Sequence, residues 1–407
     1  MRLDLLRGSF KSRISYAKKG FIMDFDYEML LKTTSDLVKI ESINPPGLEE
    51  AVGEYLVDFL REASIETSVY PVENGRFNVV GRIQGIERSP SLVFTGHMDV
   101  VPVSGKEKER WDTRPFSGEI KDGFLYGRGS SDMKGGLASA MVAMSEIAKR
   151  GIKPARDIYL IATVDEEDSM KGSRGLLKEA FLDTIGLLVV CEPTGLKICT
   201  AGKGRTYADI RVTGQTGHGS QGKGGNVIDF ARQLMNKMHE TSFTEYENTI
   251  YGSSFWQPLS ISAGREPCII PDELVLKVDA RLVPDHRTED IWLRMEGIIK
   301  ALEDENPGCE AAIEIIDRRE GWILPAASEA ISKLKDIYED LNIPFETTFF
   351  AGTTDGSILR KNNFECLIVG PGDLAGVHRE NERVSLQDLV QSCRIYLEMM
   401  KRPLKNI

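Results

Sequence analysis

Apolar residues along this chain follow two patterns, one with the spacing of helices and one of short continuous runs. Residues 26–40 and 49–63 repeat apolar side chains every three or four positions, so we expect two amphipathic helices there. Residues 135–150 have the same spacing but many small side chains. That combination favours a third helix that packs closely on a sheet.

Continuous apolar runs predict strands that are buried on both faces, as the central strands of a parallel sheet are. Such runs occupy residues 77–83, 92–95, 157–164, 187–191 and 364–369. Together with the helices between them, they predict an α/β fold in which helices flank a mixed, mostly parallel sheet.

The pattern changes in the middle of the chain. Between residues 203 and 318 the expected order is strand, helix, two strands, helix, strand, which is the order of a ferredoxin-like α+β unit. A chain of 407 residues is long for a single core. We therefore predict a domain of residues 203–318 inserted into a first domain of residues 26–202 and 319–407. Residues 1–25 are basic and lack the apolar core of a secretory signal, so we expect a disordered extension.

Five residues that can bind a metal ion each follow the end of a predicted strand. They are His97, Asp132, Glu167, Glu192 and His378. In open α/β sheets, sites form beyond the carboxyl ends of parallel strands, so we expect these side chains to meet. Imidazole and carboxylate are ligands that zinc accepts. Asp99, two residues after His97, could accept a hydrogen bond from the other ring nitrogen and orient the ring.

Composition and charge narrow the function classes. Apart from the basic residues 1–25, no basic block offsets the net charge of −11, which argues against nucleic-acid binding. No apolar run reaches the length of a transmembrane helix, so we expect no membrane association. The six cysteines are scattered without a Cys-x-x-Cys pair, which favours reduced thiols in a cytoplasmic protein.

Several motifs of the sequence are informative in combination. They are residues 96–102 (GHMDVVP), 127–136 (GRGSSDMKGG), 165–167 (DEE), 192–194 (EPT), and His378 followed by Asn381 and Glu382. In this order they resemble the di-zinc deacylase and exopeptidase family that includes acetylornithine deacetylase, succinyl-diaminopimelate desuccinylase, aminoacylase and glutamate carboxypeptidase. The resemblance covers nearly everything after about residue 27.

The resemblance implies two zinc ions, for which cobalt or manganese could substitute, bridged by Asp132. His97 and Glu192 would complete one site, and Glu167 and His378 the other. Glu166 would be the general base on a water or hydroxide shared by the metals, and Asp99 would be the partner of His97. The family also implies a cis peptide bond between Asp132 and Met133.

The same resemblance assigns the inserted domain the role of a lid and dimerisation domain, so we expect a homodimer through residues 203–318. His218 would donate to the tetrahedral oxyanion, often across a dimer interface or after domain closure. Arg281 would hold the substrate carboxylate, and the turn at Gly352 and Thr353 would face the same group. Cys268 departs from the family, in which Asn is common at its position, and this affects the expected specificity.

We therefore predict a metal-dependent hydrolase of amino-acid metabolism that cleaves the amide bond of an N-acyl amino acid. A carboxypeptidase or dipeptidase of the same family is the alternative within this chemistry. A non-catalytic amino-acid-binding protein would be expected to lose a ligand or the base, and this chain keeps all of them. A phosphate site at the Gly-rich residues 127–136 is disfavoured because the phosphate-loop spacing is missing.

Overall fold

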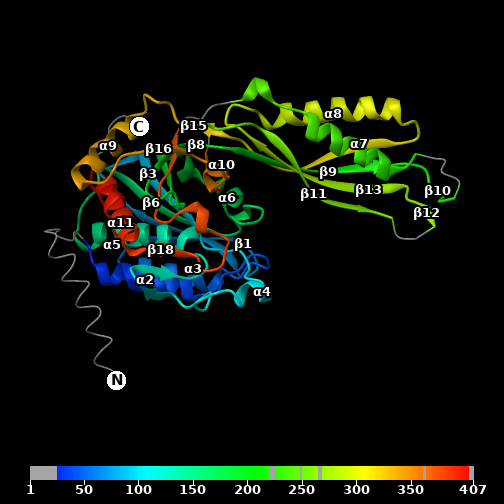
Figure 1. Cartoon of the computed structure of the whole chain (residues 1–407). Helices are drawn as coiled ribbons and strands as arrows, with labels where there is room; N and C mark the ends of the chain where they lie inside the picture. Colours follow the sequence, from blue (N-terminus) through cyan, green and yellow to red (C-terminus); the bar gives the residue numbers. More distant parts are fainter. Residues whose placement is uncertain (1–24, 221–224, 248–249, 265–267, 361–363, 403–407) are drawn as a thin grey trace.

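The computed structural model of this chain describes residues 25–220, 225–247, 250–264, 268–360 and 364–402. The expected N-terminal extension therefore lies outside the described residues, apart from residue 25. The chain folds into a main body and an elongated inserted unit that extends away from it (Figure 1). Each part has its own hydrophobic core.

The main body is built on a mixed sheet of nine strands within the described residues. In spatial order the strands are β1 (Glu66–Glu73), β2 (Arg76–Ile83), β6 (Arg156–Thr163), β3 (Glu87–His97), β7 (Ile185–Val190), β17 (Glu365–Ile368), β8 (Ile198–Gly202) and β15 (Trp322–Ile323), with β16 (Thr347–Phe350) also paired to β8. The central strands β6, β3, β7 and β17 run parallel to one another, and β1, β2 and β15 pair antiparallel. The predicted α/β class with a mixed sheet is confirmed.

Helices cover both faces of this sheet. On one face lie α3 (Glu50–Glu62) and α5 (Gly135–Lys149), with α2 (Tyr27–Lys39) and α11 (Leu386–Lys401) packed against α5 and α9 (Glu329–Leu341) against α11. The other face carries α10 (Asp355–Leu359), which contacts α6 (Lys171–Leu176). A Cβ atom at Gly136 would lie 1.9 Å from the carbonyl oxygen of Cys191, so α5 can approach the end of β7 only with glycine there. This explains the glycine at position 136 of the helix.

A second, three-stranded sheet lies beside the main one. It consists of β18 (Arg383–Ser385), β5 (Phe124–Tyr126) and β4 (Glu119–Lys121), all antiparallel, and the long loop before it contains the short helix α4 (Gly105–Lys108). The strand that precedes Asp132 therefore does not belong to the central sheet. Pairing of β18 with β5 brings two segments together that are more than two hundred residues apart in sequence.

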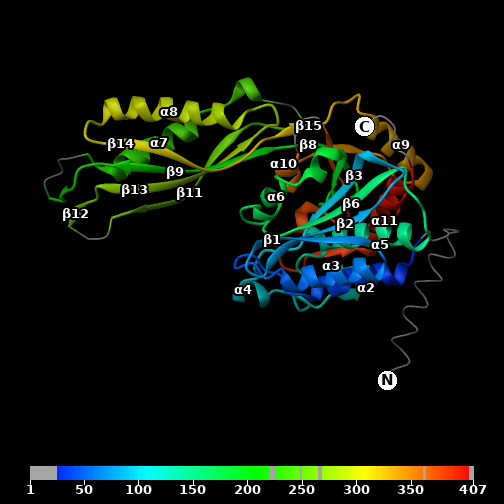
Figure 2. The same ribbon diagram turned by 180° about the vertical axis from the view of Figure 1, so that it is seen from behind.

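The inserted unit has the expected strand and helix order. Its elements are β9 (Gly204–Thr213), α7 (Val227–Glu240), β11 (Phe255–Ala263), β13 (Glu273–Leu282), α8 (Thr288–Glu305) and β14 (Glu310–Arg319). The strands form an antiparallel sheet in the order β11-β13-β9-β14, and both helices lie on one face of it (Figures 1 and 2). A short hairpin-like pair, β10 (Gly217–His218) with β12 (Ile269–Ile270), forms its far tip.

The chain enters and leaves the inserted unit through two neighbouring segments. Trp322 pairs with Gly202 in the main sheet, while Arg319 pairs with Arg205 in the inserted sheet. Between these pairs the two backbones are so close that a Cβ atom at Gly204 would lie 2.9 Å from the amide nitrogen of Gly321. The connection is therefore a narrow crossing of two strands.

Two further features bear on the environment of the protein. Among the helices that the structure describes, none combines the length and apolarity needed to cross a bilayer. All six cysteines are free and only Cys268 is exposed, in agreement with the expected mostly buried thiols.

Candidate metal centre

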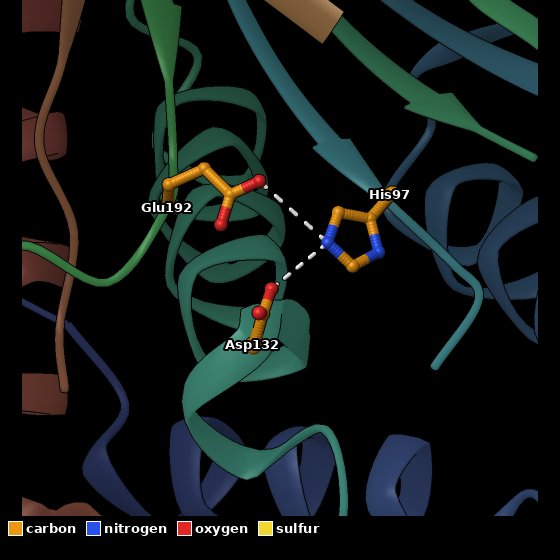
Figure 3. Close-up of side chains that lie close together, drawn as sticks. All are labelled: His97, Asp132 and Glu192. Carbon is orange, nitrogen blue, oxygen red and sulfur yellow. Dashed lines mark hydrogen bonds and ion pairs between the residues drawn. The ribbon is translucent and has the colours of Figure 1, made fainter. Parts of the chain in front are cut away.

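Three of the predicted ligands converge in one buried cluster. His97 is the last residue of β3, and its ring points at the carboxylates of Asp132 and Glu192 (Figure 3). His97 Nε2 lies 3.0 Å from Asp132 Oδ1 and 3.6 Å from Glu192 Oε1. One ligand atom from each residue lies within 4.8 Å of the others, which is close enough for all three to share one ion.

Asp132 also belongs to a second cluster. His378 Nε2 lies 3.2 Å from Asp132 Oδ2 and 3.0 Å from Glu167 Oε1, and these ligand atoms again lie within 4.8 Å of one another. The two oxygens of Asp132 thus face different histidines. This is the arrangement that a carboxylate bridging two ions requires.

The five residues reach this place from different kinds of element. His97 is the last residue of β3, and Glu167 and Glu192 follow the carboxyl ends of β6 and β7, as expected. Asp132 instead comes from a single tight turn, Ser130–Lys134, that leads into α5, and the Asp132–Met133 peptide bond is cis, as the family resemblance implied. His378 lies ten residues beyond β17, in a loop where its φ is +60°.

The clusters carry more negative charge than their histidines can balance. Burial raises the pKa of Glu192 and Glu167, and the neighbouring Asp132 carboxylate raises both further. Burial opposes charge on His97, but Asp132 and Glu192 outweigh it and hold the pKa of His97 well above its ordinary value. Buried carboxylates that repel one another in this way are stabilised by a cation placed between them.

Metal binding here should depend on pH. Hydrogen bonds to Asp132 and Glu167 raise the pKa of His378 to about 10, so its ring carries a proton at pH 7 in the metal-free protein. A metal ion must displace that proton, and we expect its affinity to rise between pH 6 and pH 9. Calorimetric titration in two buffers of different ionisation enthalpy should show proton release at pH 7. Equal affinities across this range without proton release would contradict the proposed site.

The sign of the stability effect in the metal-free protein follows from the same shift. The folded-state pKa of His378 lies above its ordinary value of 6.5. Its interactions with Asp132 and Glu167 therefore stabilise the fold fully below about pH 6.5, and this contribution is lost as the pH rises through about 10.

Asp99 holds the loop that carries the candidate base. His97 Nδ1 lies 2.9 Å from the backbone oxygen of Asp99 and 3.6 Å from its carboxylate, so the carbonyl is the nearer partner. The carboxylate of Asp99 accepts the backbone N–H groups of Glu166 at 3.2 Å and Glu167 at 3.0 Å. It thereby fixes the start of the turn in which a ligand and the candidate base stand side by side.

Glu166 itself is only 8% exposed. Burial raises the pKa of Glu166 well above its ordinary value; His97 acts against this shift, and the carboxylates of Asp355 and Glu167 add to it. A carboxylate with a raised pKa at the edge of a metal cluster is suited to accept and pass on a proton at neutral pH.

A buried ion-pair network behind this turn was not predicted from the sequence. Arg76 donates to both oxygens of Glu49, at 2.9 Å and 2.5 Å, and to Asp165 at 2.8 Å. Asn44 joins Asp165 to Asp99, through hydrogen bonds of 3.1 Å and 2.9 Å. The only sequence signal was the run of turn-forming residues Asn44-Pro45-Pro46-Gly47, which indicated a turn but did not identify a partner for Asn44.

Breaking this network should cost much stability. In an Arg76→Met variant the carboxylates of Glu49 and Asp165 stay buried without their cation, and we expect a loss of about 3–5 kcal/mol in the free energy of unfolding. Arg211→Met is the matched control, because Arg211 and its partner Glu314 are about half exposed and should cost below about 1 kcal/mol. Urea titration of the metal-free proteins measures both. Equal losses would show that the buried network adds nothing.

An open cleft of about 750 Å³ lies between the Glu167 turn of the main body and the inserted unit. Glu167 lines it on the main body, and Arg205 and Tyr207 of β9 line it on the inserted unit. Arg281 lies opposite Arg205 in the sheet register, and both pair with Asp279, at 2.8 Å and 3.2 Å. The predicted carboxylate-binding Arg281 is thus on the end of β13 nearest the main body.

The turn at Gly352 and Thr353 directly precedes α10. Arg319, which enters from the end of β14, donates to Thr353 Oγ1 at 3.4 Å and to the backbone oxygen of Asp168 at 2.7 Å. This arginine connects the turn to the acidic loop and to the base of the inserted unit.

His218 is not brought to the clusters within one chain. It forms part of β10, at the far tip of the inserted unit, where it is exposed and lies 2.8 Å from Ser220 Oγ (Figures 1 and 2). The backbone oxygen of Cys268 accepts the N–H of the next residue, Gly219, at 2.9 Å. Any role for His218 in catalysis thus requires a large movement or a second chain.

Known proteins resemble this chain over most of its length. A sequence model of Peptidase family M20/M25/M40 matches residues 93–402, a range that contains all five candidate ligands. A probable succinyl-diaminopimelate desuccinylase of Staphylococcus aureus strain N315 is 27% identical over 413 residues, which cover 94% of this chain and 99% of the relative.

Solved structures share the fold. A tripeptidase of Staphylococcus aureus Mu50 superposes with a TM-score of 0.74 at 20% identity, covering 93% of this chain and 98% of the other. A dinuclear metal-binding peptidase of the M20 family from Bacillus subtilis superposes with a TM-score of 0.72 at 14% identity, covering 94% and 99%.

Proposed function

Because the chain belongs to peptidase family M20/M25/M40 and is therefore a hydrolytic enzyme, we propose that it cleaves the amide bond of small N-acyl amino acids. The proposal depends mainly on one observation, the placement of Asp132 between two ligand clusters, each with one histidine and one further carboxylate. The likeness to a probable desuccinylase supports acylated amino acids, acetylated or succinylated, as the substrate class.

The donor set fits a pair of divalent cations. Two imidazoles and three carboxylates are ligands of zinc, and cobalt and manganese accept the same groups. The family is metal-dependent. We propose zinc in both clusters, held by His97, Asp132 and Glu192 on one side and by Asp132, Glu167 and His378 on the other.

The chain's own residues would then divide the work. When bound, divalent cations would supply positive charge that acidifies the attacking water and polarises the scissile carbonyl. Glu166 would take the proton of that water and deliver it to the leaving amine, since its raised pKa suits both transfers at neutral pH. Asp99 would keep Glu166 in place through the backbone bonds described above.

The cleft supports an anionic substrate. Of the four cations that lie where the inserted unit meets the main body, Arg205 lines the cleft, and the other three are near it: Lys203, Arg281 and Arg319. Burial lowers the pKa of Lys203 and Arg205, and repulsion from Arg281 lowers both further, so these cations are close enough to affect one another. We propose that Arg281, with Gly352 and Thr353, holds the carboxylate of the amino acid. The remaining positive charge favours an acyl group that carries a second carboxylate, such as succinyl.

A substrate panel tests the proposed activity. Metal-free protein would be reloaded with zinc, cobalt or manganese and given acetylornithine, succinyl-diaminopimelate, acyl-glutamates and dipeptides. We expect the acyl amino acids to be hydrolysed fastest, and only after metal is restored. Faster cleavage of dipeptides would move the assignment to the exopeptidases. Hydrolysis of none, with two metals bound, would favour a binding protein on this scaffold.

We also propose a homodimer through the inserted unit, in which His218 of one chain serves the cleft of the other. The edge strand β11 supports it, because Phe255, Leu259 and Ile261 there are 46–55% exposed. An Ile261→Lys variant should sediment as a monomer and lose most of its turnover while keeping its metal. Full turnover as a monomer would contradict this arrangement.

The free thiols support a cytoplasmic location.

A further inference from the structure

The buried carboxylate of Glu382, on the His378 loop, accepts hydrogen bonds from the turn that contains Asp132. Glu382 is 1% exposed and stands four residues after His378. Its Oε1 accepts three backbone N–H groups, from Gly129 at 2.9 Å, Ser131 at 3.1 Å and Asp132 at 3.2 Å. Three convergent amides form a pocket for a negative charge, and the chain fills it with its own side chain.

Arg128 holds the other side of the same carboxylate. Arg128 Nη1 donates to Glu382 Oε2 at 2.7 Å and to the backbone oxygen of Arg379 at 3.2 Å, and Nη2 donates to Glu107 at 2.6 Å. The guanidinium is 1% exposed and lies 5.7 Å from the ring centroid of Trp111. It therefore connects the Asp132 turn, the His378 loop and the long loop around α4.

The backbone reinforces this connection. The N–H of Gly127 bonds to the carbonyl of Glu382 at 2.9 Å, and β18, which begins one residue later, pairs with β5. Ser131 Oγ donates to the carbonyl of Arg383 at 2.9 Å. The segment from 127 to 132 and the segment from 379 to 383 are thus joined by both backbone and side-chain hydrogen bonds.

We propose that Glu382 is a positioning residue that fixes Asp132 and His378 relative to each other, with Arg128 as its clamp. Neither side chain belongs to the two ligand clusters, and both act through the backbone that carries the ligands. Asp99 plays a similar part for His97 and Glu167. It stands two residues after His97, and its carboxylate accepts the backbone N–H groups of Glu166 and Glu167. Four of the five candidate ligands, all except Glu192, are therefore tied in pairs by a buried carboxylate.

The charge of Glu382 matters for this role. Hydrogen bonds in which one partner is ionised are shorter and stronger than neutral ones, and a single carboxylate oxygen here accepts three of them. Glutamine at this position would keep the shape, but its NH₂ group would compete with amide donors or face Arg128. Outer partners of this kind typically affect metal affinity by about 10–100-fold when they are replaced.

Cobalt binding to the metal-free protein tests this inference, which rests on the proposed metal centre. The Co²⁺ absorption bands report both affinity and coordination geometry. We expect Glu382→Gln to weaken Co²⁺ binding by about 10–100-fold and to change the bands. Glu380→Gln is the matched control, since Glu380 lies two residues upstream, its side chain is 39% exposed and it pairs only with Arg110 among the bonds that the described residues show; it should bind as the wild type does.

A stability control separates positioning from simple weakening of the fold. Leu334→Ala creates a cavity in the core at α9, away from both loops, and should lower the Tm without altering Co²⁺ binding well below the Tm. If Leu334→Ala loses as much affinity as Glu382→Gln, the inference is overturned. Wild-type affinity in Glu382→Gln overturns it as well. Failure of the wild type to bind Co²⁺ would instead remove the proposed metal centre.

Arg128→Lys covers the case in which Glu382→Gln does not fold. Lysine keeps the positive charge but cannot reach Glu382, Arg379 and Glu107 together, so we expect an intermediate loss of Co²⁺ affinity. An affinity equal to that of the wild type would count against the clamp.

Discussion

Replacing Glu166 with glutamine should lower kcat by about 10²–10⁴-fold, the range that a general base contributes. The glutamine keeps the size of the side chain and its place beside Glu167, but it cannot accept the proton of the attacking water. Because Glu166 is not one of the five ligands, both metal ions should stay bound. Steady-state kinetics and metal analysis of the same preparation measure the two effects together.

The neighbouring Asp168→Asn serves as the control for this variant. Asp168 lies in the same acidic turn, two residues further on, and its side chain is exposed. Its replacement should leave kcat within a few-fold of the wild-type value. Wild-type turnover in Glu166→Gln would overturn the assigned base, and loss of metal would show that Glu166 is a ligand.

Removing the carboxylate of Asp132 should empty both metal sites at once. Its two oxygens face His97 and His378, so an Asp132→Ala variant deprives each cluster of one ligand and of the charge that unites them. We expect the affinity for both ions to fall by more than the roughly 100-fold that outer partners cost, and turnover should disappear with them. Metal content after dialysis against dilute zinc measures the result.

Glu192→Gln distinguishes a shared ligand from an ordinary one. Glu192 belongs to the His97 cluster alone, so this variant should keep the ion held by Glu167 and His378. Retention of two ions by Asp132→Ala, or equal losses in both variants, would contradict a bridging role for Asp132.

The sequence predicts that candidate ligands lie close together best where each ligand follows an apolar run that forms a strand of the parallel sheet. Apolar runs end at His97, before Glu167 and before Glu192, and parallel strands bring such ends to one edge of a sheet. The order of elements in the inserted unit followed from its periodicity in the same way. The roles of the individual residues, and the exact domain boundaries at 203 and 318, remain predictions.

Other parts of the site depend on contacts that periodicity cannot reveal. The strand before Asp132 looked like a member of the central sheet but pairs with β18, which lies 257 residues later at Arg383. The partners of Arg76 and Glu382 are likewise distant in sequence. The nearest acceptor for His97 Nδ1 is a backbone carbonyl, a kind of group that every residue carries and no motif marks.

The narrow crossing at Gly204 and Gly321 has the geometry of a hinge between the inserted unit and the main body. A small rotation there would sweep the tip with His218 through a wide arc, while the two separate cores would keep their packing. A larger side chain at Gly204 or Gly321 would therefore restrict this rotation without changing any residue of the metal clusters.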